Sequence, residues 1–78
     1  MATIDTVRDV VLKSRSDLAA KFKPEAAVAG DLGLNSLEIA NLTVKLERAF
    51  GIDIPMERIH TLVTVADVVQ YIDSHKKK

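Results

Sequence analysis

The sequence predicts an all-α fold, a four-helix bundle with a long first loop and a short third helix. Apolar residues recur at three- and four-residue spacing in separate segments, as in helices that bury one face. Proline, glycine and helix-capping residues mark the ends of these segments. The chain has 78 residues and no shift in composition along its length, so residues 1–78 are expected to form a single domain.

The first helix is predicted near the N-terminus, where Thr3 is placed to cap its start. Its inward stripe consists of aliphatic residues at helical spacing: Ile4, Val7, Val10, Val11 and Leu18. A long loop is predicted from Ala20 to Asn35, because Pro24, Gly30 and Gly33 interrupt a segment without sustained periodicity. We expect three apolar residues to pin this loop to the core: Phe22, Val28 and Leu32. Such pins favour a functional loop over a disordered one.

The second helix is predicted from Ser36 to Gly51, which ends it as a C-cap. Its inward face is apolar and comprises Ile39, Leu42, Leu46, Ala49 and Phe50. Asn35 followed three residues later by Glu38 predicts a capping box at its start. Leu37 and Val44 lie off the apolar stripe.

Two further helices are predicted in the C-terminal third of the chain. Pro55 suits the first turn of a short helix that would run through about Leu62, with Ile59 and Leu62 facing inward. Thr64, with Asp67 in the first turn, predicts the start of the last helix. Its inward residues would be Val65, Val68, Val69 and Ile72.

Composition limits the location and the chemistry of the protein. No cysteine supplies a disulfide or a thiolate zinc site, so the core must come from aliphatic packing. Asp5, Arg8 and Asp9 stand where a signal peptide needs an apolar run. No stretch approaches the roughly 20 apolar residues that span a bilayer. We therefore expect a soluble, cytoplasmic monomer without stable membrane insertion.

The charge pattern argues against nucleic acid as the main partner. The formal net charge is zero, but Lys76, Lys77 and Lys78 are expected to form a frayed, solvated tail. Without them, eight basic residues remain against eleven acidic ones, a net charge of −3. Nucleic-acid binding depends on a clustered basic face, which this pattern does not predict.

Ser36 is the candidate for chemistry, since a glycine-containing loop delivers it to the first turn of an amphipathic helix. A phosphodiester on this serine would lie beside backbone N–H groups and the positive end of the helix dipole, a placement worth about 0.3 to 1 kcal/mol. The local pattern alone favours the simpler interpretation, a serine or asparagine that only caps the helix.

Five blocks of sequence favour a modified Ser36 over a residue that only caps the helix. They are Asp-Leu-Gly-Leu-Asn-Ser-Leu-Glu at 31–38, Leu46-Glu47, Phe-Gly-Ile-Asp-Ile-Pro at 50–55, Thr64-Val65 and Tyr-Ile-Asp at 71–73. In these blocks and their spacing the chain resembles the acyl carrier protein family. The resemblance covers most of the chain.

The resemblance implies that Ser36 carries a 4′-phosphopantetheine arm, with Asn35 and Leu37 beside it in the cofactor site. A separate phosphopantetheinyl transferase would attach the arm from coenzyme A. Acyl groups would then be held as thioesters and presented to fatty-acid, lipid or related biosynthetic enzymes that load, elongate or transfer them.

The carrier itself would be no enzyme. A serine nucleophile needs an adjacent base, and neither His60 nor His75 neighbours Ser36 in sequence. Two scattered histidines give no metal-ligand spacing, so no metal site is predicted.

The resemblance also implies an acyl cavity and a partner surface. Candidate cavity residues are Ile39, Leu42, Leu46, Ile54, Ile59, Leu62 and Val68, each of which equally fits an ordinary core. Candidate partner-binding residues on the second and third helices are Glu38, Asn41, Lys45, Glu47, Arg48 and Ile59. Glu47 and Arg48 could alternatively only solvate the outer face of the helix.

Two departures from the family pattern stand out. Asn35 replaces the aspartate that the family usually places before the modified serine, so we expect slower or more selective modification. Lys45 and Arg48 dilute the acidic second helix of typical members, which predicts a specialised carrier with its own enzymes.

Alternatives stay open at this stage. The cargo could be an aminoacyl, peptidyl or polyketide unit, although Leu34-Asn35 before the serine is closer to fatty-acyl carriers. Two other classes are a helical protein-interaction module without a prosthetic group and a small nucleic-acid-binding domain that uses the lysine tail.

Overall fold

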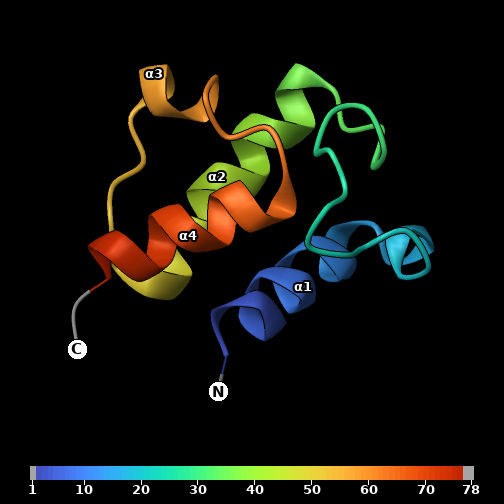
Figure 1. The fold of residues 1–78 in the computed structure, drawn as a ribbon, viewed down its shortest axis with the longest axis horizontal. Coiled ribbons are helices and arrows are strands. Elements are labelled where there is room, and N and C mark those ends of the chain that lie inside the picture. Colours follow the sequence, from blue (N-terminus) through green and yellow to red (C-terminus); the bar gives the residue numbers. More distant parts are fainter. Residues whose placement is uncertain (1, 77–78) are drawn as a thin grey trace.

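The computed structural model describes residues 2–76 and confirms the all-α fold. Four α-helices and one 3-10 helix follow in the order α1 (Thr3–Ser14), η1 (Ser16–Leu18), α2 (Ser36–Phe50), α3 (Met56–Ile59) and α4 (Val65–His75). Within these residues the β-structure is an isolated bridge between Ala27 and Thr64. The long first loop and the short third helix are both present, as predicted (Figure 1).

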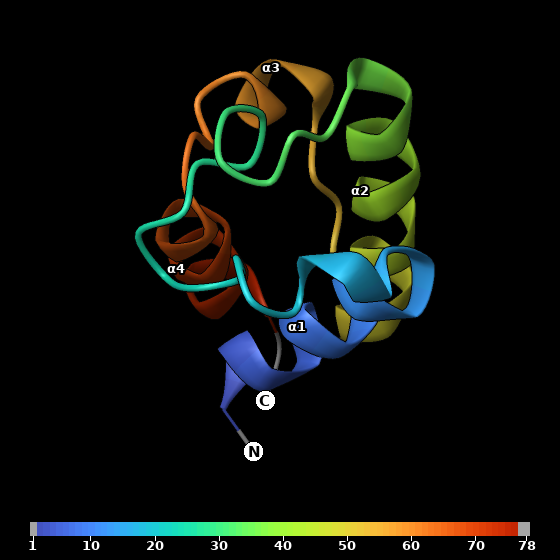
Figure 2. The same cartoon turned by 90° about the vertical axis from the view of Figure 1, so that its right-hand side faces the viewer.

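The helices surround an aliphatic core. α1 contacts both α2 and α4, and Figure 2 shows α2 and α4 on opposite sides, with α1 across one end and α3 across the other. The buried residues come from every part of the chain: Val7, Val11, Leu18, Ala26, Val28, Leu32, Leu34, Leu46, Ile54, Val65 and Ile72. Among residues 2–76, no helix has the length and the apolar character that a membrane span requires.

The start of α1 differs from the prediction. Ala2, not Thr3, is the N-cap, and it makes no side-chain capping bond. The Thr3 hydroxyl is buried and donates to the carboxylate of Asp73 in α4. Lys76 Nζ donates to Thr3 Oγ1 at 2.9 Å and lies 3.3 Å from Asp73 Oδ1. A contact between the two ends of the chain therefore takes the place of a local cap.

This contact also changes the picture of the lysine tail. Lys76 is half-buried and held by Thr3 and Asp73, so the chain is still tied to α1 at this residue. The other two lysines of the expected tail, Lys77 and Lys78, lie outside the described residues.

The first loop is pinned to the core, as predicted. Val28 and Leu32 are buried and Phe22 packs against the core. Backbone bonds tie the loop to the segment before α4: Val28 N–H donates to Val63 O at 2.8 Å, and Val65 N–H donates to Ala26 O at 3.0 Å. The loop that leads into α2 is thus an ordered part of the fold.

The capping predictions for α2 and α4 are confirmed. The Asn35 side chain accepts from Glu38 N–H at 2.8 Å, and the Glu38 carboxylate accepts from Asn35 N–H at 3.1 Å. Gly51 ends α2 with φ +66°, a left-handed conformation that glycine adopts without a Cβ penalty. Thr64 and Asp67 form the second capping box, at the start of α4.

Two helix ends differ from the prediction. α1 stops at Ser14, so Leu18 reaches the core from η1 and not from the helix. α3 stops at Ile59, three residues earlier than expected. Beyond it, Leu62 N–H donates to Ile59 O at 3.1 Å in a turn, and Val63 O is taken by the first loop. The pairing with that loop requires an extended backbone, which ends the helical turn.

Candidate functional site

Ser36 is the first residue of α2 and is exposed. Buried Leu32 and Leu34 anchor the chain before it, and Gly33 turns between them with φ +67°. The N–H groups of Ser36 and Leu37 have no acceptor within the helix, because they belong to its first turn. The hydroxyl is therefore presented at the positive end of a 15-residue helix, on an anchored backbone.

A charged cluster fixes this end of α2 to the end of α1. Arg15 Nη1 lies 2.6 Å from Glu38 Oε2, and Arg15 Nη2 lies 3.1 Å from Asp17 Oδ2. The Asn35 N–H, followed by the Arg15 guanidinium, lowers the pKa of the Glu38 carboxyl. Arg15 likewise lowers the pKa of Asp17, while the two carboxylates raise the pKa of Arg15. Glu38 thus stays ionised and helps to position the segment that holds Ser36.

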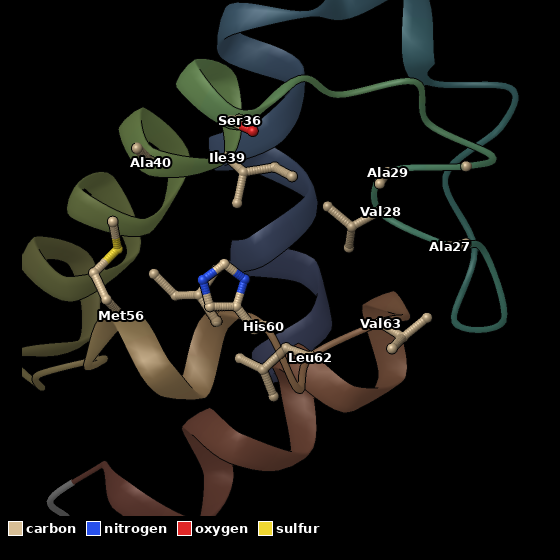
Figure 3. Close-up of a pocket in the computed structure, with 12 residues that line it drawn as sticks. Ala27, Val28, Ala29, Ser36, Ile39, Ala40, Met56, His60, Leu62 and Val63 are labelled. Carbon is tan, nitrogen blue, oxygen red and sulfur yellow. The ribbon is translucent and has the colours of Figure 1, made fainter.

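An apolar cavity of about 320 Å³ lies beside Ser36 (Figure 3). The first loop, α2, and α3 with the turn after it all contribute to its lining: Ala27, Val28, Ala29, Gly30, Ser36, Ile39, Ala40, Met56, Ile59, His60, Leu62 and Val63. We call it the outer cavity. Its volume falls within the range of about 300–1,000 Å³ that small-molecule sites occupy.

A smaller inner cavity of about 40 Å³ lies within the bundle. Its lining contains all seven residues that the sequence predicted for an acyl cavity, together with Val28 and Thr43: Ile39, Leu42, Leu46, Ile54, Ile59, Leu62 and Val68. Val28, Ile39, Ile59 and Leu62 line both cavities. These side chains therefore separate the inner cavity from the outer one.

The comparisons with known proteins give the family. The model of the phosphopantetheine attachment site family matches residues 4–72. An acyl carrier protein of Campylobacter fetus subsp. fetus is 39% identical over 77 residues, which cover 99% of this chain and all of the relative. An acyl carrier protein of Campylobacter jejuni strain RM1221 is 42% identical over 77 residues, with the same coverage.

A third relative with a lower identity belongs to the same family. An acyl carrier protein of Wolinella succinogenes is 37% identical over 76 residues, 97% of this chain and all of the relative. The chain belongs to the acyl carrier protein family. As a member, it is a carrier and not an enzyme, and its cofactor is 4′-phosphopantetheine, as the resemblance implied.

The residues around Ser36 fit this prosthetic group. The hydroxyl is exposed, so a transferase can reach it, and it lines the outer cavity, so an arm attached there starts beside an apolar surface. Asn35 already provides the helix cap through its side chain. Ser36 is therefore not needed as a cap, which removes the simplest alternative reason for a serine at this position.

The predicted partner residues of this carrier divide into two groups. Asn41, Lys45 and Arg48 are exposed on α2. The Glu47 carboxylate instead accepts from Ile54 N–H at 2.8 Å, which holds the segment after α2 against the helix. Glu47 is half-buried, and its role in partner binding stays a prediction. Glu38 is likewise taken by Asn35 and Arg15, and Ile59 lines both cavities.

Several residues at the site were missed by sequence reasoning. Met56 and Val63, which are 68% and 59% exposed, line the outer cavity together with Ala29. Met56 could have been predicted, because it is an apolar residue of the third helix that lies off the inward stripe. Arg15 gave no local signal, because it lies 23 residues from Glu38 in sequence.

The two histidines lie in different surroundings. His60 is exposed and lines the outer cavity, but no hydrogen bond joins it to Ser36 in the described structure. His75 stacks on Tyr71 with ring centroids 4.1 Å apart. Residues 2–76 contain no group of three or more His, Cys, Asp or Glu side chains that could hold a metal ion.

Proposed function

We propose that Ser36 is the attachment residue for 4′-phosphopantetheine in this carrier. The observation that supports it most directly is the exposed hydroxyl at the first turn of α2, on the rim of the outer cavity. Asn35 and Leu37 flank the site, and Asn35 keeps the helix capped when Ser36 is modified. When bound, the arm supplies a thiol that carries acyl groups as thioesters.

The α2 terminus would stabilise the modified form. A phosphodiester at Ser36 lies next to the free N–H groups of the first turn, where an exposed anion gains about 0.3 to 1 kcal/mol. The negative charge of Glu38 is offset there by Arg15, at 2.6 Å. Arg15 also pairs with Asp17, at 3.1 Å, so one positive charge is shared between two carboxylates near the new anion.

The cavities would shelter the acyl chain. The outer cavity, at about 320 Å³, is large enough for the first carbons next to the arm, whereas the inner cavity, at about 40 Å³, is far smaller. A longer chain must widen the inner cavity by displacing Ile39, Ile59 or Leu62. Each methylene that is buried offsets this cost by about 0.8 kcal/mol.

The partners of a carrier in this family are a phosphopantetheinyl transferase and enzymes that handle acyl groups. We assign the cargo to fatty-acid or lipid biosynthesis. We expect residues 1–78 to form a single carrier domain that works in the cytoplasm as a monomer. Mass spectrometry of the protein from its own cells would read the cargo directly, and gel filtration would test the monomer.

Intact mass spectrometry tests the attachment site. Incubation with coenzyme A, magnesium and a broad-specificity transferase should add one phosphopantetheine to the wild type and none to Ser36→Ala. Ser16→Ala is the matched control, since Ser16 is also exposed but lies in η1, and this variant should be modified like the wild type. Modification of the folded Ser36→Ala variant would refute the assignment.

A further inference from the structure

The outer cavity combines an apolar lining with one imidazole. Among the described residues that line it, two have polar side chains, Ser36 and His60, and the others are glycine, alanine, valine, isoleucine, leucine and methionine. In the proposed modified form the Ser36 oxygen belongs to the phosphodiester, so it no longer offers a hydroxyl. His60 then remains as the polar side chain of this lining.

The His60 ring turns its hydrogen-bonding edge into the cavity. Figure 3 shows both ring nitrogens on the side that faces Ile39 and Ser36. The Nδ1 atom of His75 lies 2.9 Å from Tyr71 O, whereas no hydrogen bond within residues 2–76 engages the His60 ring. Both nitrogens of the exposed His60 side chain are therefore available to a group that enters the outer cavity.

The inner cavity offers no equivalent partner. Thr43 supplies the polar side chain of its lining, and the other lining residues are valine, isoleucine and leucine. The Thr43 hydroxyl donates to Ile39 O at 2.8 Å, so its proton is already engaged. A polar group that moved into this cavity would lose its bonds to water without replacement. A polar substituent on the cargo is thus best placed in the outer cavity, on the first carbons next to the arm.

A saturated chain and a hydroxylated chain differ in what they do to His60. A saturated chain in the outer cavity displaces water from the ring and gives the ring no new partner. A neutral imidazole has one donor and one acceptor nitrogen, and a hydroxyl group can both donate and accept. A hydroxyl on the first carbons can therefore pair with the His60 ring in either tautomer.

We propose that His60 is a specificity-determining residue, which favours acyl groups that carry a hydroxyl on the first carbons next to the thioester. The proposal rests on the proposed function, because the arm on Ser36 must bring the cargo into the outer cavity. The apolar remainder of the chain would extend past Ile39, Ile59 and Leu62, which line both cavities, toward the inner one. His60 would then offset the loss of water at the cargo hydroxyl.

A cycle of two changes tests the pairing of His60 with the cargo. The unmodified wild type and His60→Leu are each loaded by a transferase from octanoyl-coenzyme A or 3-hydroxyoctanoyl-coenzyme A, and the unfolding constants are measured in urea. The intrinsic cost of removing the hydroxyl from water is common to both proteins and cancels in the cycle. We expect the hydroxyl to stabilise the wild type about three- to tenfold more than His60→Leu, in the unfolding constant, as one neutral hydrogen bond does.

Two further variants separate hydrogen bonding from a change in packing. His60→Gln keeps a donor and an acceptor, so it should retain part of the difference between the two cargoes. His75→Leu is the matched control, because His75 stacks on Tyr71 and is absent from the lining of both cavities. The difference between the cargoes should be the same in His75→Leu as in the wild type.

Nitrogen NMR of the imidazole rings gives a second readout. The ring signals of His60 should shift between the octanoyl and the 3-hydroxyoctanoyl forms, while those of His75 stay in place. Equal effects of the hydroxyl in the wild type and His60→Leu, unresponsive His60 signals, or an equal loss in His75→Leu would overturn the proposal. A shift of the His60 signals on attachment of the arm, with no further response to the hydroxyl, would assign His60 to the arm and also overturn it.

The proposed function fails separately from this inference. Failure of the wild type to gain the arm, or gain of the arm by Ser36→Ala, would overturn the attachment site and the role of His60 together. With one arm attached at Ser36, a cycle without the expected difference would refute the role of His60 and leave the attachment site standing.

Discussion

Enlarging the inner cavity at Leu46 should weaken the empty carrier more than the acylated one. Leu46 is 2% exposed, belongs to the core and lines the inner cavity of about 40 Å³. Truncation of a buried leucine to alanine costs about 2–5 kcal/mol, from lost burial and from the space left behind. A domain of this size has a total stability of about 4–12 kcal/mol. Leu46→Ala should therefore bring the holo-protein close to its unfolding threshold.

Acylation should recover part of this loss. The cavity in the variant can take carbons of an octanoyl chain that the wild type admits only after displacing side chains. Each methylene buried there contributes about 0.8 kcal/mol, so two or three would return about 1.5–2.5 kcal/mol. The stabilisation on octanoylation should be larger in Leu46→Ala than in the wild type by this amount.

Urea unfolding followed by circular dichroism measures both quantities, with holo and octanoylated samples of each variant. Val44→Ala is the matched control on the same helix, because Val44 is 45% exposed and its truncation should change the free energy of unfolding by less than about 0.5 kcal/mol. Equal stabilisation by the octanoyl chain in Leu46→Ala and the wild type would refute the assignment of the inner cavity to the cargo.

Two further predictions concern the first turn of α2. Asn35→Asp should raise the rate of phosphopantetheinylation several-fold, because the carboxylate attracts magnesium and can still accept from Glu38 N–H. The rate is measured by mass spectrometry of samples stopped at set times. An unchanged rate would show that the Asn35 amide does not limit modification. Glu38 has a pKa below its ordinary value of 4.5 in the folded protein, owing to Asn35 N–H and then Arg15. Its contribution to stability is complete above that ordinary value and is lost as the pH falls through the folded pKa. Wild-type stability should thus decline on acidification below about pH 4.5 more steeply than that of Glu38→Gln; parallel urea titrations of the two proteins from pH 7 to pH 3 would contradict this.

Local sequence signals predicted the elements well where the deciding contacts are close in sequence. The capping box of Asn35 and Glu38 and the left-handed Gly51 join residues that are at most four apart, so their geometry follows from the residue types. The resemblance implied an acyl cavity, and six of its seven predicted residues lie on predicted inward helix faces, whereas Ile54 lies between α2 and α3.

The errors fall where a distant partner competes with a local one. Thr3 looked like a cap, but the Asp73 carboxylate, 70 residues away, takes its hydroxyl. The bond from Ile54 N–H to the Glu47 carboxylate, formed after the chain turns at Gly51, was likewise not predicted. No pattern of neighbouring residues contains either bond.

The sequence by itself determined the helical elements, the family and the serine at the start of α2, since capping, periodicity and motif spacing are properties of short segments. Only the tertiary structure decided which charges remain available on the surface. Folding pairs Arg15 with Glu38 at 2.6 Å, whereas Lys45, which donates to the Ser14 hydroxyl, and Arg48 are exposed on α2. The reason is that Arg15 and Glu38 lie 23 residues apart in sequence, so only the folded chain brings them together.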